Sequence, residues 1–319
     1  MESSAFPLTL LACCLAGVAS HLCYFIRGEH HRHVGRLATF VVVVPVTFTA
    51  LIVQFSDIPL GLACRLTFLM TSAYAAGLFS SITIYRAFFH RLRQFPGPVA
   101  MRITKFAHMY RSRKLDNYLQ LGSLRKQYGD FVRTGPNELT IFRPDAHTAM
   151  HGPQSKCNKP EWYDLTYPMV SMQQTRDKAD HNRRRRIWDK AFSVKAINGY
   201  HPRVVAHLDA FERKLADQQN QAINMTDWFN FLSFDIMGDV SFGTEFNLVE
   251  TGKIHFAIKM IRAGAIPVGL MTPVPWLFRL VSSIPGAMRT FHQLIRWSKE
   301  EAVRRLQVSR AIAESISIF

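Results

Sequence analysis

The sequence predicts a mainly α-helical protein with one small β hairpin, preceded by three transmembrane helices. Residues 1–85 hold only four basic and three acidic side chains and contain three uncharged apolar windows. The other 234 residues therefore carry 35 basic and 20 acidic side chains, which is +15 of the net charge of +16. With 48% apolar residues, the chain is not of the disordered or low-complexity class.

The three windows predict membrane helices at about residues 7–26, 37–55 and 66–85. A helix of about 20 residues just crosses a hydrocarbon core about 30 Å thick. Burial of all three windows inside a soluble domain is the first alternative. A cleaved signal peptide is an alternative for the first window alone, although no basic residue precedes it.

Loop charges predict the orientation of these helices. The first loop carries Arg27, Arg32 and Arg36, whereas the second has only Arg65 at its edge. Basic loops stay on the cytosolic side, so the first loop and everything after Tyr85 are expected in the cytosol. This predicts a multi-pass protein with a cytosolic C-terminal domain.

Residues 86–114 are expected to form a basic juxtamembrane hinge. From Arg86 to Leu115 there are eight basic residues and no acidic one, so membrane lipids with anionic headgroups are the expected partner. The motif Phe95-Pro96-Gly97-Pro98 interrupts any helix that continues from the third window. Nucleic acid is not expected as a partner, because three membrane helices would keep the chain from reaching it.

The segment after the hinge begins with a short helix and a hairpin. A helix is expected at about residues 115–128, followed by strands at 131–133 and 138–142. Gly135-Pro136-Asn137 between the strands has the residue types of a tight turn. After Pro144 the pattern is mainly helical.

Four blocks carry a resemblance to a known family. They are FPGP (95–98), YGDFVRTGPNEL (128–139), HNRRRRIWDKAF (181–192) and FDIMGDVSFGTEF (234–246). In this order they resemble the N-terminal portion of a fungal microsomal cytochrome P450, a haem-thiolate monooxygenase, and residues 297–307 are similar to its helix G. The resemblance covers about residues 86–307 and implies a partial P450 fold over residues 115–319.

The block at 181–192 contains the candidate binding site. His181 and Arg185 are four residues apart and therefore share one helix face, where a donor and a permanent cation suit a carboxylate. The resemblance implies that both bind the propionates of haem b. The alternative is an ordinary solvated basic face formed by the four consecutive arginines at 183–186.

The resemblance also implies partners. It assigns Arg183, Arg184, Arg186 and Lys190 to the docking surface for an NADPH–cytochrome P450 reductase, which would be the route for electrons from NADPH. It further implies a small lipophilic substrate, most often in secondary metabolism, and a location in the endoplasmic reticulum membrane. Residues 261–285 correspond to the region between helices F and G that roofs the substrate pocket; a core loop with two short helices is the alternative.

Several family features are missing. None of the five cysteines is followed two residues later by glycine, as the family's haem ligand is. Ala263-Gly264 lacks the acid–threonine pair of helix I, and the ExxR matches at Glu301 and Glu29 lie outside the place of helix K. No catalytic residue or metal-ligand set is assigned. We therefore expect a truncated domain, with residues 308–319 departing from the family pattern, that does not bind haem as a thiolate complex.

One non-enzymatic alternative stays open. The chain would then be a three-span membrane protein whose basic cytosolic domain binds a partner.

Overall fold

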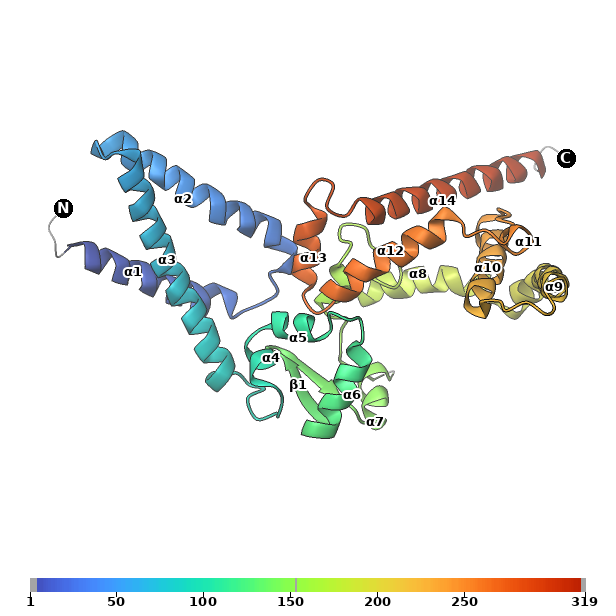
Figure 1. Ribbon diagram of the computed structural model, residues 1–319, viewed down its shortest axis with the longest axis horizontal. Helices are drawn as coiled ribbons and strands as arrows, with labels where there is room; N and C mark the ends of the chain where they lie inside the picture. Colours follow the sequence, from blue (N-terminus) through green and yellow to red (C-terminus); the bar gives the residue numbers. More distant parts are fainter. Residues whose placement is uncertain (1–4, 153, 317–319) are drawn as a thin grey trace. The chain divides into compact units, whose positions relative to one another are not determined.

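The computed structural model describes residues 5–152 and 154–316, with only the backbone for 308–316. The chain forms two compact units, residues 1–170 with 268–283 and residues 171–267 with 284–319. The fold is mainly helical with one two-stranded antiparallel sheet, as expected from the sequence (Figure 1). The three-part division at residues 85 and 114 follows composition rather than contacts and stays a prediction.

Three N-terminal helices are long and apolar enough to cross a membrane. The segments, including short π and 3-10 turns, are α1 (Ala5–Ser20), η1 (His21–Phe25), η2 (His31–His33), α2 (Val34–Ser56), α3 (Leu60–Ile84) and η3 (Tyr85–Phe89). The expected ten-residue second loop was wrong, because α3 already begins at Leu60, directly after its N-cap Pro59. A single arginine near a helix end does not interrupt the helix, since its long side chain can reach the interface.

Helices α1 and α3 pack closely through two glycines. A Cβ atom at Gly17 would overlap the backbone carbonyl of Tyr74, and one at Gly77 would overlap that of Cys14. Small residues allow such backbone approach between apolar helices, where the hydrophobic effect adds little. Figure 1 shows α3 crossing α1 in this part of the chain.

The hairpin and three helices form a small core after the apolar N-terminal helices. Their bounds are α4 (Val99–Ile103), α5 (Lys105–Arg111), α6 (Asn117–Tyr128), β1 (Phe131–Gly135) and β2 (Glu138–Ile141), followed by α7 (Asp145–His151) and η4 (Glu161–Asp164). Met101, Leu124 and Val132 are at most 1% exposed and pack together. The expected helix and both strands are thus confirmed to within a few residues.

A bulge shapes strand β1. Val132 pairs with Thr140 and Gly135 with Glu138, so β1 has one residue more than β2 between these pairs. Val132, Arg133 and Thr134 are consequently all buried, which regular alternation along a strand does not give. The other edge of β1 is partly covered, since the backbone N–H of Arg133 donates to Pro96 at 2.8 Å.

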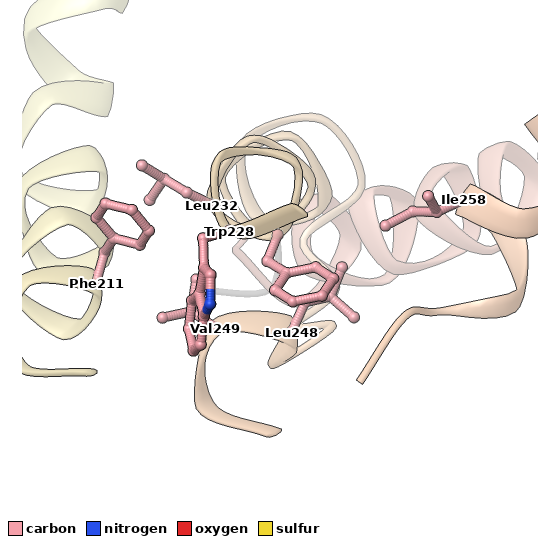
Figure 2. Close-up of a cluster of buried hydrophobic side chains, with 7 residues drawn as sticks. Phe211, Trp228, Leu232, Leu248, Val249 and Ile258 are labelled. Atoms are coloured by element: carbon pink, nitrogen blue, oxygen red, sulfur yellow. The ribbon is translucent and has the colours of Figure 1, made fainter. Parts of the chain in front are cut away.

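The second unit is helical. Its elements are α8 (Lys178–Ala191), α9 (Val194–Ala216), α10 (Met225–Met237), η5 (Gly238–Phe242), α11 (Leu248–Thr251), α12 (Phe256–Met271), which continues past this unit, and α14 (Arg289–Ile316). Figure 2 shows Phe211 of α9, Trp228 and Leu232 of α10, and Leu248 and Val249 of α11 gathered in one apolar cluster with Ile258. Burial of such large side chains contributes about 1.5–3 kcal/mol each.

The region expected between helices F and G contains two helices. Its first part is the end of α12, which includes Pro267, and its second part is α13 (Pro275–Ser282). α13 contacts α2 and η2 within the first unit. Its place in the family fold stays a prediction.

Candidate functional site

The candidate binding helix α8 begins at a well-formed N-cap. The carboxylate of Asp177 accepts hydrogen bonds from the backbone N–H groups of Ala179 at 2.8 Å and Asp180 at 3.3 Å. Such a cap satisfies two of the four free donors at a helix start. The helix therefore begins one turn before the basic run, so His181–Arg186 all lie within its regular part.

His181 and Arg185 lie on α8 as expected, but their side chains are not joined. Arg185 Nε donates to Asp189 at 2.7 Å, and both side chains are more than half exposed. His181 is half-buried and its Nδ1 lies 3.5 Å from the Asn182 side-chain oxygen. Arg185 is therefore directed to its own helix, one turn further along.

The four residues assigned to the reductase surface differ in their partners. Arg183 and Arg184 both donate to Asp180, at 2.7 and 2.8 Å. The hydrogen bond from Arg183 lowers the pKa of Asp180, so this carboxylate stays charged at neutral pH. Arg186 and Lys190 are exposed.

The same helix also exposes large apolar side chains. Ile187 is 63% exposed, Trp188 52% and Phe192 64%. An apolar group of this size on one helix is unusual for a surface that meets only water. Ile187 and Trp188 lie on the same fourteen-residue helix as the basic face, and Phe192 is the C-cap residue of that helix.

The block at 234–246 is structural. Asp235 is 3% exposed, and its two carboxylate oxygens accept from the backbone N–H groups of Leu248 at 3.0 Å and Val249 at 2.9 Å. This carboxylate therefore fixes the start of α11 against α10. A buried charge is tolerated when hydrogen bonds replace the lost water.

A second carboxylate of this block ties η5 to α9. Arg203 Nε donates to Asp239 at 3.0 Å, a second guanidinium nitrogen also contacts that carboxylate, and His207 Nε2 lies 3.3 Å away. The hydrogen bond from Arg203 lowers the pKa of Asp239. Both aspartates of the block thus bind groups of the protein itself.

A polar junction in the first unit was not found from the sequence. Asp164 is 4% exposed and accepts from His31 Nε2 at 2.8 Å and from Arg32 Nε and Nη2 at 3.0 and 2.8 Å. Arg279 of α13 donates to the backbone carbonyl of Asp164 at 2.7 Å. The loop between the first two apolar helices is thereby attached to η4 and α13.

This junction also brings potential metal ligands together. Ligand atoms of Glu29, His31 and Asp164 lie within 4.8 Å of one another. Both oxygens of Asp164 already accept from the guanidinium of Arg32, which supplies the positive charge that a cation would add. The sequence indicated no such group, since Asp164 lies more than 130 positions from Glu29 and His31.

Haem is the cofactor of the family that the sequence resembles, and it requires a cysteine thiolate as its iron ligand. The positions of the cysteines therefore bear on whether the described residues could hold it. All five cysteines are free, and four of them, at 13, 14, 23 and 64, lie in the apolar N-terminal helices. The fifth, Cys157, is exposed in the irregular segment between α7 and η4. None of the five cysteines, all of which lie among the described residues, is buried.

Comparison with known proteins agrees with the sequence blocks. The family model for cytochrome P450 matches residues 96–310. The chain is 36% identical over 306 residues to the cytochrome P450 monooxygenase notG' of Aspergillus versicolor, covering 95% of this chain and 56% of that protein. No solved structure matches.

Two further relatives extend the comparison. Tryprostatin B 6-hydroxylase of Neosartorya fischeri is 34% identical, over 92% of this chain and 54% of its own length. The cytochrome P450 monooxygenase FCK2 of Fusarium pseudograminearum is 34% identical, over 89% of this chain and 52% of its own. The chain thus spans about half the length of the curated relatives it matches. Together, the matched residues and the relatives establish that the chain belongs to the cytochrome P450 family.

Proposed function

We propose that the protein is a membrane-anchored cytochrome P450 monooxygenase that oxidises a small lipophilic substrate of secondary metabolism. The observation that carries this proposal is the family match over residues 96–310. One of the fungal relatives is named as a hydroxylase of tryprostatin B, which supports oxidation of this type. The three apolar N-terminal helices support attachment to the endoplasmic reticulum membrane, with the later residues in the cytosol.

We assign His181 and Arg185 to the propionates of haem b in the complete domain. The support is their spacing of four residues on α8, since an Arg and a His on one face can bind carboxylates. For this role Arg185 has to exchange Asp189 for a propionate. Both side chains of that pair are more than half exposed, so the exchange costs little, about 1 kcal/mol or less.

The basic face of α8 is the proposed docking surface for an NADPH–cytochrome P450 reductase. Arg186 and Lys190 are exposed, and Arg183 has 62% of its side chain exposed despite its bond to Asp180. A cluster of cations accelerates encounter with an acidic partner. Electrons from NADPH would reach the domain by this route.

These 319 residues alone are proposed not to bind haem through a thiolate. Cys157 is the one cysteine outside the apolar helices, and it is exposed. The thiolate is needed for oxygen chemistry because it donates electron density toward O–O cleavage. Membership of the family therefore does not by itself give these 319 residues monooxygenase activity.

The test is the carbon monoxide difference spectrum of reduced membranes that contain the 319-residue chain. We expect no Soret band of thiolate-ligated haem. If that band appears, the Cys157→Ser variant tests whether this cysteine is the ligand, and the proposal for the isolated chain is wrong. If neither the chain nor the complete reading frame gives the band, the non-enzymatic alternative is favoured, a three-span membrane protein with a basic cytosolic interaction domain.

A further inference from the structure

Three arginines gather where the third apolar helix meets the hairpin. Arg86 lies in η3, Arg102 in α4 and Arg133 in β1. Arg133 Nη2 donates to the backbone carbonyl of Arg86 at 3.0 Å, and Arg86 Nη1 donates to the carbonyl of Ile103, the neighbour of Arg102, at 2.8 Å. We call these three residues the arginine cluster.

The arginine cluster has no counter-ion. Within the described residues, no carboxylate lies within 4.0 Å of a nitrogen of Arg86, Arg102 or Arg133. The nearest acid on β2, Glu138, is paired with Lys105. Three permanent cations therefore share one region in which, among the described residues, their guanidinium groups donate to backbone carbonyls alone.

Several donors of the cluster are buried without a partner. Arg133 is 0% exposed, and its Nε and Nη1 have no hydrogen-bond partner, nor does the buried Nε of Arg102. An unsatisfied buried donor costs about 1–3 kcal/mol, and more for a charged group. Burial, together with the charge of Arg102, lowers the pKa of Arg133. Such an arrangement is stabilised by an anion.

The position of the cluster indicates which anion is at hand. Arg86 lies in the last segment of the third apolar helix, at its cytosolic end under the proposed orientation. This is the level of phospholipid headgroups. Arg86 and Arg102 are both partly exposed, so an anion can reach them, whereas the fully buried Arg133 contributes through its charge.

An apolar groove reaches the same end of the helix. It lies between α1 and α3, has a volume of about 450 Å³ and is lined by Cys14, Val18 and Leu22 of the first helical segment. On the other side it extends to Tyr85 and Phe89, which flank Arg86 in η3. A groove of this kind accommodates an acyl chain beside a bound headgroup.

We propose that the arginine cluster binds the phosphate of an anionic phospholipid, whose acyl chain occupies the groove between α1 and α3. Guanidinium groups bind phosphate through paired, charge-assisted hydrogen bonds. The bound lipid would supply the counter-charge for Arg86, Arg102 and Arg133 and so fix η3 against α4 and β1. The proposal rests on the membrane anchoring proposed above.

The experiment uses the full chain in phosphatidylcholine nanodiscs with a small fraction of phosphatidic acid, read out by native mass spectrometry after release into detergent. We expect one retained phosphatidic acid, preferred over phosphatidylcholine by about tenfold or more, as for one charged hydrogen bond. The Arg102→Gln variant should lose most of this preference. The Arg91→Gln variant removes the same charge from an exposed position and should leave the preference unchanged.

Folding is controlled separately. Within the described residues the Arg102 side chain forms no hydrogen bond, so the Arg102→Gln variant should melt at the wild-type temperature. Arg133→Gln tests the buried member and is scored only if its melting temperature is preserved. Equal retention of both lipids, or an equal effect of Arg91→Gln, would overturn the proposal. So would displacement of phosphatidic acid by inorganic phosphate, which would point to a soluble anion. Failure of the chain to enter nanodiscs would contradict the anchor instead.

Discussion

Replacing Asp235 by asparagine tests whether the acid in the 234–246 block acts as a structural cap. The carboxylate is 3% exposed and accepts from two backbone N–H groups, those of Leu248 and Val249. An asparagine oxygen can accept from one of them, while its NH₂ group faces the other donor. One bond to a charged acceptor is lost and one buried donor is left unpaired, each worth about 1–3 kcal/mol.

Part of this loss is offset, because a neutral amide is less costly to bury than a carboxylate. We therefore expect Asp235→Asn to lower the free energy of unfolding by about 2 kcal/mol, or the melting temperature of the second unit by about 4–8 °C. The assay is thermal unfolding of the full chain in detergent, followed by near-ultraviolet circular dichroism, which reports on the packing of Trp228. Hydrogen exchange at the amides of Leu248 and Val249 should accelerate at the same time.

Asp209→Asn is the matched control, since Asp209 is exposed on α9 and its side chain forms no hydrogen bond or ion pair with the described residues. It removes the same charge and should leave the melting temperature unchanged. Equal melting temperatures for the two variants would refute the capping argument. A lower melting temperature of Asp235→Asn with unchanged hydrogen exchange at Leu248 and Val249 would also refute the capping argument, because the cap acts on those two amides.

Two further predictions concern the hairpin region. In Gly97→Ala the new Cβ would overlap the backbone carbonyl of Arg133, so we expect a loss of about 1–3 kcal/mol in thermal unfolding, whereas Gly122→Ala, with open space around it, should be neutral or stabilising. Burial lowers the pKa of His108, so the folded protein favours the neutral imidazole. The resulting stabilisation is fully present above the pKa of the unfolded chain, about 6.5, and is lost as the pH falls below that value. Melting temperatures measured across that range should fall on acidification, and His108→Gln should flatten the slope where His147→Gln, at an exposed site, should not. An unchanged slope in the first variant would contradict the assignment.

Local patterns predicted much of the fold. The hairpin was found within two residues because a Gly-Pro-Asn turn between two β-type runs has few other solutions. The predicted second loop was wrong because a charged residue such as Arg65 does not mark a helix boundary, and the helix that starts at Leu60 contains it. The position of a charged residue therefore does not fix where a helix begins.

The sites depended on contacts that no local pattern contains. The partner of His31 lies 133 positions away, in a short 3-10 segment with no distinctive spacing. In the sequence, Arg133 does not differ from the other residues of the predicted strand. Its burial accompanies the bulge in β1, which the sequence does not indicate. The acid-free run from Arg86 to Leu115 was the available signal, and it indicated a charged surface rather than a cluster that includes Arg133.

The junction at Asp164 has a consequence for the order in which the chain matures. Its partners at positions 31 and 32 are synthesised long before Asp164, and Arg279 follows more than 100 residues later. Since a nascent chain leaves the ribosome at about 5–20 residues per second, the loop at positions 31 and 32 waits for several seconds before it can close onto η4 and α13. Under the proposed membrane anchoring, this interval would allow the first two helices to insert before the junction forms.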